Sequence, residues 1–232
     1  MICPLCNRQY KKEQFQPYGP SKRPFVACPN CFSSDRERLA CLFILKPGLS
    51  LTKVLHLAPE KKIHSLLKKK AKHYVCGDIE PQQYRSMQCI YLDATNIPIP
   101  NNTVDFVYAS HILEHIVDDK KAMSEIYRIL NDNGTLLAMV PQHLDKDTTF
   151  EDETIVDPKE RLRHFGQEDH VRIYGLDFSQ RLKDSGFIVE IYCHISMQHT
   201  IEKMCYDKKY FFDQEVENYN LNKNEILYVC KK

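Results

Sequence analysis

The sequence of 232 residues predicts an α/β domain with a mostly parallel sheet and helices on both faces, preceded by a small cysteine-rich segment. Two observations predict this arrangement. From Leu51 onward, short apolar runs alternate with segments of helical periodicity, which is typical of a parallel sheet covered by helices. Before that point, the cysteine-rich segment has few aliphatic residues to form a core and carries two C-x-x-C pairs. The turn Lys46-Pro47-Gly48 separates the two parts, so we expect one unit over residues 1–46 and another over 47–232.

The first segment carries the pairs Cys3/Cys6 and Cys28/Cys31. Two intervening residues let both sulfur atoms of a pair point at one ion, and the second pair completes a tetrahedron, as in a zinc ribbon. Metal binding would also supply the folding energy that so small a core lacks. Disulfides are the alternative, but the other six cysteines are scattered and mostly in apolar contexts. We therefore expect a structural zinc ion, with iron as the competing metal.

In the second segment, apolar runs bounded by turn residues predict seven strands, at 53–58, 73–79, 90–92, 104–110, 135–140, 188–193 and 225–230. A helix is expected after Pro59, because Ile63, Leu67 and Ala71 share one face. A second helix begins at Asp118 or Asp119 and ends at Asn133-Gly134. A third runs over 177–185 and stops at Gly186.

Composition excludes several classes of protein. The longest unbroken apolar run, Leu39–Leu45, has seven residues, far short of the roughly 20 that a membrane helix needs. Apolar residues at 43% and charged residues at 27% are ordinary for a globular chain. The first residues show no charged-then-apolar signal pattern, so we expect a soluble, cytoplasmic protein without a membrane partner.

Charge is distributed unevenly along the chain. Residues 1–75 carry fifteen Lys or Arg against four Asp or Glu, a net charge of +11, which four thiolates and one zinc ion would lower to about +9. A basic region of this kind can meet the phosphate backbone of RNA, although solvated lysines are the commoner explanation.

Two stretches resemble the central motifs of class I S-adenosylmethionine-dependent methyltransferases of the type 11-like group. They are residues 91–119 (YLDATNIPIPNNTVDFVYASHILEHIVDD) and 128–141 (RILNDNGTLLAMVP). With the C-P-x-C ribbon, VLHLAPE (54–60) and RHFGQEDHVRIYG (163–175), the chain is similar to a bacterial subgroup of these enzymes. The resemblance implies a Rossmann-like sheet of seven strands, the last one antiparallel, with S-adenosylmethionine bound over the first four.

The resemblance also implies roles for residues that follow the strands. Asp78, followed by Ile79, would accept both ribose hydroxyls of the cofactor, and Asp93 would accept the adenine amino group beside a backbone donor at Ala94. The pair Ser110 and His111 would line the methionine arm. Acids in these places also serve as ordinary loop or helix caps.

The first loop departs from the pattern of the family. The usual glycine-rich sequence, which lets the backbone approach the cofactor, is replaced by His56–Glu60 without a glycine. Ala58 is nearly as small, and Glu60 could bind the cofactor's ammonium group. A chain that kept the fold but lost its cofactor would look similar.

Residues 142–174 lie where this fold builds substrate specificity, so we expect an ordered acceptor lid. A neutral histidine suits proton removal from an attacking oxygen or nitrogen. We favour His170 in this role, because alternation puts it on a common face with Arg172 and Tyr174. The alternative is that these side chains only pin the lid to the domain. The other candidates are His164, His143 and, one turn after the fourth strand, Glu114 and His115.

The lid is acidic, with nine Asp or Glu against four Lys or Arg between His143 and His170. This charge suits a small neutral or cationic acceptor better than a phosphate backbone. The pair Asp145/Asp147 lacks the further ligands that a metal site needs. The leading hypothesis is therefore methyl transfer to an oxygen or nitrogen of a small molecule. Two alternatives stay open: an RNA methyltransferase that uses the ribbon and the lysines of 61–72, and a catalytically silent binding module.

Overall fold

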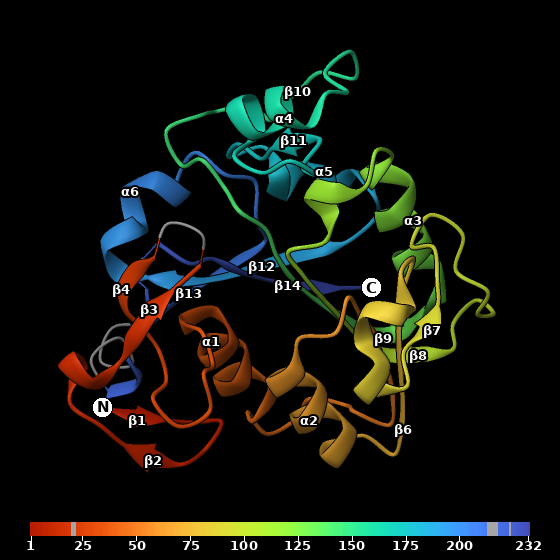
Figure 1. The fold of residues 1–232 in the computed structure, drawn as a ribbon. Helices are drawn as coiled ribbons and strands as arrows, with labels where there is room; N and C mark the ends of the chain where they lie inside the picture. Colours follow the sequence, from red (N-terminus) through yellow and green to blue (C-terminus); the bar gives the residue numbers. More distant parts are fainter. Residues whose placement is uncertain (20–21, 213–217, 223) are drawn as a thin grey trace.

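A single mixed sheet organises the computed structural model, which describes residues 1–19, 22–212, 218–222 and 224–232. Within these residues the sheet has eight strands in the order β13-β12-β14-β9-β8-β5-β6-β7 (Figure 1). Every neighbouring pair is parallel except those of β14, which runs antiparallel to both β9 and β12. The strands are β5 (Lys53–Leu57), β6 (His73–Asp78), β7 (Ile90–Tyr91), β8 (Val104–Ser110), β9 (Leu130–Met139), β12 (Ile188–His194), β13 (Lys208–Phe212) and β14 (Leu227–Lys231).

The predicted fold class is confirmed, with one difference. The expected Rossmann-like sheet with an antiparallel last strand is present, but β13 adds an eighth strand parallel to β12. Its sequence, KKYFF, shows no alternation of polar and apolar residues, so the pattern that predicted the other strands is missing here.

Helices cover both faces of the sheet, because its strands bury side chains on both sides. Phe106 and Tyr108 of β8 pack with α1 (Asp35–Ile44) and α2 (Lys61–Lys70), whereas Val107 and Ala109 pack with α3 (Asp119–Ile129) and α5 (Phe178–Asp184). Figure 1 shows α1 and α2 in front of the sheet. The shorter helices are α4 (Pro158–Phe165), α6 (Gln198–Ile201), η1 (Lys12–Gln14), η2 (Pro81–Met87), η3 (Leu113–His115) and η4 (Ile195–Met197). Among the described helices, none is long and apolar enough to cross a membrane.

The cysteine-rich segment consists of two hairpins. Strand β1 (Ile2–Cys3) pairs with β2 (Arg8–Gln9), and β3 (Gln16–Tyr18) pairs with β4 (Arg23–Ala27). Helix α1 follows at once, capped by Ser34, whose hydroxyl accepts a hydrogen bond from the Glu37 amide. Although α1 falls within residues 1–46, its Leu39, Phe43 and Ile44 belong to the hydrophobic cluster on one face of the sheet.

A fully buried arginine joins this segment to the other end of the chain. The guanidinium of Arg38 donates to the carbonyls of Val26 and Ser33 in the hairpin region, at 3.0 and 2.7 Å. It also donates to the carbonyls of Tyr219 and Asn220, at 2.9 and 2.6 Å. One buried side chain therefore donates hydrogen bonds to four carbonyls from two distant parts of the sequence.

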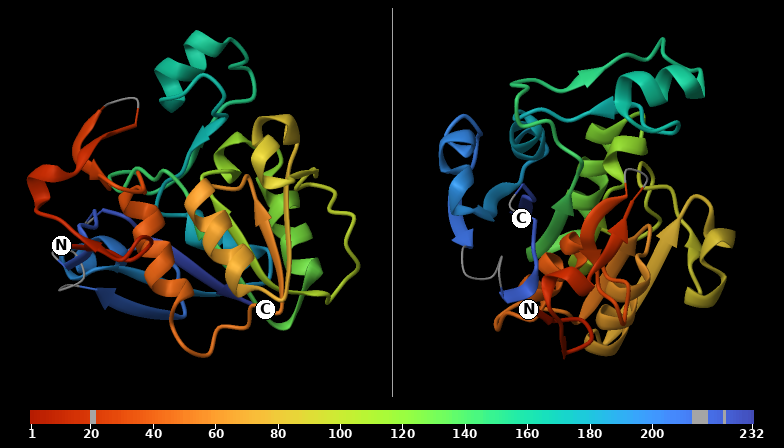
Figure 2. Two further views of the ribbon diagram at one scale, coloured as in Figure 1. Left: turned by 60° about the horizontal axis from the view of Figure 1, so that its bottom comes forward. Right: turned by 60° about the vertical axis from the view of Figure 1, so that its left-hand side comes forward.

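Residues 142–174 form an ordered segment at one end of the molecule (Figures 1 and 2). Strand β10 (Phe150–Glu151) pairs antiparallel with β11 (Arg172–Ile173), and α4 lies between them. Asp157 caps α4 by accepting hydrogen bonds from the amides of Lys159 and Glu160. A bridge between Gln142 and Tyr174 closes the base of the segment.

Candidate functional site

A pocket of about 680 Å³ opens at the carboxyl ends of β5, β6, β7 and β8. This is the edge of a parallel sheet at which ligands bind. Most of its lining follows directly after these four strands. The lining residues are Leu57, Ala58, Gly77, Asp78, Ile79, Glu80, Gln83, Tyr84, Leu92, Asp93, Ala94, Thr95, His111, Ile112, His115, Ile116, Val117, Asp118 and Asp169.

Asp78 ends β6 and presents a half-buried carboxylate to the pocket. One oxygen accepts a hydrogen bond from the Glu80 amide at 2.8 Å, and the other accepts one from the Tyr84 hydroxyl at 3.3 Å. These contacts fix the orientation of the carboxylate and leave further lone pairs free for hydroxyl donors. Gly77, the preceding residue, lies too close to Leu92 for a side chain, since an added Cβ would come within 2.5 Å.

Asp93 follows β7 on the same side of the pocket. One of its carboxylate oxygens accepts hydrogen bonds from the amide and the hydroxyl of Thr95, both at 2.8 Å. These hydrogen bonds form a local turn, as expected if Asp93 acts as a loop cap. Ala94 is buried beside it and also lines the pocket.

The glycine-free first loop adopts a backbone conformation that favours glycine. Ala58 has φ of 47°, in the left-handed region, and its amide donates to the Gly77 carbonyl at 3.0 Å. His111, which follows β8, also has a positive φ, of 53°. Such conformations cost roughly 1–2 kcal/mol for residues with a Cβ and are common at ligand sites. Ala58 therefore adopts, without being glycine, a backbone conformation that favours glycine.

Glu60 is engaged elsewhere. Its carboxylate accepts hydrogen bonds from the Arg36 guanidinium at 3.0 Å and from the Tyr108 hydroxyl at 2.9 Å. Within the described part of the chain, the pocket lining does not include Glu60 or Ser110, which is 3% exposed. The structure thus brings Ala58, Asp78, Ile79, Asp93, Ala94 and His111 together around one pocket and leaves Glu60 and Ser110 outside its wall.

A buried group of ionisable side chains lies behind the pocket at η3. Glu114 is fully buried, and among the described residues neither of its carboxylate oxygens has a hydrogen-bond partner. One of these oxygens is 3.5 Å from Nδ1 of His111 and 4.0 Å from Nε2 of His115. Burial raises the pKa of the Glu114 carboxyl to about 8 and lowers the pKa of His111 well below its usual value.

His115 connects this group with the pocket and the lid. Its Nδ1 is 3.1 Å from a carboxylate oxygen of Asp169, and both residues line the pocket. Its ring packs edge-on against that of His170, with centroids 4.7 Å apart. His170 is 7% exposed, burial lowers its pKa, and its Nδ1 lies 3.2 Å from the Phe165 carbonyl. The expected lid histidine therefore contacts His115, which is the side chain that faces the pocket.

Arg172 and Tyr174 are buried on the side of the lid that attaches to the domain. The guanidinium of Arg172 donates to Glu151 at 2.9 Å and to the carbonyls of Leu113, Ile116 and Val117 around η3. The Tyr174 hydroxyl donates to Asp119 at 2.7 Å.

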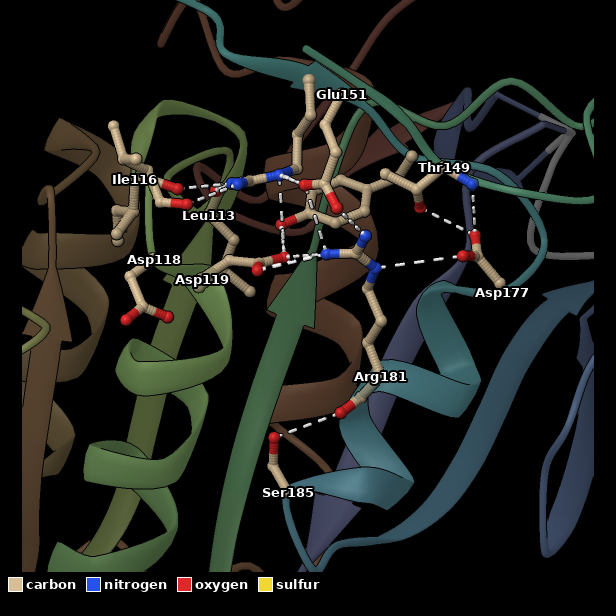
Figure 3. Close-up of polar contacts among 12 residues, drawn as sticks. Leu113, Ile116, Asp118, Asp119, Thr149, Glu151, Asp177, Arg181 and Ser185 are labelled. Carbon is tan, nitrogen blue, oxygen red and sulfur yellow. Dashed lines mark hydrogen bonds and ion pairs between the residues drawn. The ribbon is translucent and has the colours of Figure 1, made fainter. Parts of the chain in front are cut away.

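Figure 3 shows this attachment. Asp119, Glu151 and Asp177 converge there on the side chain of Arg181. The contacts of Arg172 and Tyr174 are those expected if the two residues pin the lid.

The remaining lid histidines lie apart from the pocket. His164 on α4 is 3.5 Å from Glu160, and His143 is 3.9 Å from Asp145. Within the described ranges neither contributes to the lining. Tyr84 and Asp169 are among the pocket residues that sequence reasoning missed. The hydroxyl of Tyr84 donates to Asp78, six residues before it. Asp169 precedes His170 and contacts His115, which lies 54 residues earlier in the sequence.

The four cysteines of the hairpin segment lie together. Their sulfur atoms are all within 4.8 Å of one another, with 3.6 Å between Cys3 and Cys31 and 3.7 Å between Cys6 and Cys28. These separations are close to the edge of about 3.8 Å in a tetrahedron with zinc–sulfur bonds of about 2.3 Å, and far longer than the roughly 2.05 Å of a disulfide. The cluster is compatible with the predicted zinc ribbon.

Comparison with known proteins finds a family match over part of the chain. Residues 54–138, from β5 through most of β9, match the family model described as a methyltransferase domain. No curated protein sequence matches the chain significantly.

Three solved structures have the same fold, each covering more than four fifths of this chain. The first is a SAM-dependent methyltransferase from Archaeoglobus fulgidus, with 14% identity, a TM-score of 0.54, and coverage of 85% of this chain and 92% of that one. The second is a S-adenosylmethionine-dependent methyltransferase from Mesorhizobium loti, with 13% identity, a TM-score of 0.54, and coverage of 83% and 96%. The third comes from Thermotoga maritima and is described as a possible histamine N-methyltransferase, with 15% identity, a TM-score of 0.51, and coverage of 84% and 87%.

Proposed function

We propose that this protein is a methyltransferase that uses S-adenosylmethionine to methylate an oxygen or nitrogen atom of a small-molecule acceptor. The charge of the pocket is the observation that carries the proposal. Five carboxylates line it, from Asp78, Glu80, Asp93, Asp118 and Asp169, whereas no lysine or arginine does so among the described residues. Such a wall attracts a positively charged sulfonium and repels a phosphate backbone.

Six of the eight residues predicted to bind the cofactor line the pocket, which supports this proposal. The carboxylate of Asp78 is already oriented by two donors and would accept the ribose hydroxyls. Asp93 and Ala94 would meet the adenine ring, and Ala58 with His111 would border the methionine arm. When bound, S-adenosylmethionine supplies a methyl group on a positively charged sulfur. The protein then has to orient the acceptor against that methyl group and exclude water.

The lid contributes to this site through Asp169 and through the attachment of η3 by Arg172. Its histidines were expected to take a proton from the acceptor, yet His170 meets the pocket only by way of His115. We therefore propose another role for this pair below.

The acceptor class can be tested by labelling. Incubation of the protein with S-adenosylmethionine carrying a labelled methyl group and a cell extract should place the label in the small-molecule fraction. Label in RNA would instead favour the alternative in which exposed lysines of α2, such as Lys61 and Lys69, hold phosphate. A parent protein that neither labels any fraction nor binds the cofactor would be the catalytically silent module.

We also propose that Cys3, Cys6, Cys28 and Cys31 hold one structural zinc ion. The double variant Cys6→Ser, Cys28→Ser should contain one zinc ion fewer per chain than the parent, because two of four thiolate ligands are lost. Elemental analysis of protein purified without added metal measures this difference. A matched double variant of cysteines outside the cluster, Cys89→Ser, Cys205→Ser, should keep the parent's metal content. Full metal content in the first variant would refute the assignment.

A further inference from the structure

We propose that Glu114, His115 and His170 form a second metal site, which binds a divalent transition-metal ion beside the pocket. One ligand atom of each residue lies within 4.8 Å of those of the other two. Two imidazoles and one carboxylate are a ligand set that suits zinc, iron or cobalt, with further coordination positions left for water or a substrate. The site is separate from the four cysteines and does not depend on methyl transfer.

The first argument is the state of Glu114. A carboxylate that is fully buried normally has donors for its oxygens, because leaving it without them is costly. Here both oxygens lack a hydrogen-bond partner among the described residues, although Nδ1 of His111 is 3.5 Å away and ring nitrogens of His115 and His170 lie within 4.8 Å. A cation among these groups would satisfy the oxygens directly.

The second argument is the way in which the two histidines are held. Nδ1 of His170 donates to the Phe165 carbonyl at 3.2 Å, because a carbonyl can only accept. Nδ1 of His115 lies 3.1 Å from a carboxylate oxygen of Asp169, on the side of the ring opposite Nε2, which is 4.0 Å from Glu114. The ring of His170 therefore has its proton on Nδ1 and a free lone pair on Nε2, and the ring of His115 points its Nε2 toward Glu114. Histidines that ligate metals are typically oriented by such a bond from the opposite nitrogen to a carboxylate or a carbonyl.

The third argument is the rigidity of the supporting structure. Arg172 fixes η3, which carries Glu114 and His115, by donating to the carbonyls of Leu113, Ile116 and Val117. The amide of Val171, next to His170, donates to the Glu114 carbonyl at 3.0 Å. The lid and the η3 turn are thus joined at the backbone, and the three ligands are held together before any ion arrives.

Cobalt(II) is a suitable probe because its absorption distinguishes nitrogen and oxygen ligands from thiolates. The protein, with zinc retained in the ribbon, is titrated with cobalt(II) in the absence of S-adenosylmethionine. We expect one equivalent to bind with visible bands but without thiolate charge-transfer absorption. Glu114→Gln and His170→Asn should each weaken binding by at least about 100-fold, and Asp169→Asn by about 10- to 100-fold.

The control is His164→Asn, a lid histidine whose ring contacts Glu160 instead of this cluster, and it should bind cobalt like the parent. Circular dichroism of each variant, and calorimetry of Asp169→Asn, whose side chain is mostly exposed, separate loss of a ligand from loss of folding. A parent protein that takes up no cobalt outside the ribbon would overturn the proposal. Equal binding by the parent, Glu114→Gln and His170→Asn would overturn it as well.

Discussion

Replacement of Arg172 by methionine should lower the free energy of unfolding by about 3–5 kcal/mol. Arg172 is 3% exposed, and its guanidinium donates to the Glu151 carboxylate and to three backbone carbonyls around η3. Methionine keeps the apolar stem but removes the side-chain donor to the carbonyls of Ile116 and Val117 and the cation 3.8 Å from the buried Asp119. Breaking a buried ion pair from one side costs about this much. Urea unfolding of the purified variant measures the loss.

The matched control for this variant is Arg163→Met on α4. That side chain is 77% exposed, and its polar contact among the described residues is an ion pair of 3.9 Å with Glu160. Exposed pairs of this kind contribute about 0–1 kcal/mol, so this substitution should change stability little. Equal stability of the Arg172 variant and the parent would show that the lid is not held by this arginine.

Asp78→Ala should weaken the binding of S-adenosylmethionine by about 2–3 kcal/mol, or roughly 30- to 150-fold. The physical reason is the loss of a charged acceptor that would receive two hydroxyl hydrogen bonds. Isothermal calorimetry with the cofactor and with its demethylated product measures the change. Tyr84→Phe removes only the hydroxyl that orients the carboxylate at 3.3 Å, so its effect should be smaller.

A control for net charge is Asp132→Ala, an exposed acid in the turn-like first part of β9 and absent from the pocket lining within the described residues. Its affinity should match that of the parent. If Asp78→Ala binds the cofactor as tightly as the parent, the proposed cofactor position is wrong. If the parent itself does not bind, the silent-module alternative gains support.

The strands could be predicted from sequence where burial on both faces gives an unbroken apolar run. Val104–Ser110 has the predicted bounds, because every residue of it except Asp105 is buried. Strand β13 could not be predicted, since its edge position demands no such pattern. Leu130–Met139 begins earlier than predicted because its first residues, around Asn133-Gly134, look like a turn.

The pocket at the edge of the sheet could be predicted because it depends on position along the chain. Asp78 ends β6 and Asp93 follows β7, and parallel strands bring their carboxyl ends to one edge. The surroundings of residues 142–174 depend on packing between distant segments. The alternation of residues 170–174 places Arg172 on a different face of the strand from Val171 and Ile173. Only the tertiary structure shows that this face contacts η3, or that Glu60 forms an ion pair with Arg36. These pairings leave no local pattern in the sequence.

Arg38 has a consequence for the order in which the molecule can assemble during synthesis. Its partners Val26 and Ser33 leave the ribosome with it, whereas Tyr219 and Asn220 are made 181 and 182 residues later. Until then, half of the acceptors of a buried charge are missing at the junction between the hairpins and α1. The cysteine-rich segment therefore reaches its final hydrogen bonding only after residues 219 and 220 have been made, and its folding is coupled to a segment about 180 residues away.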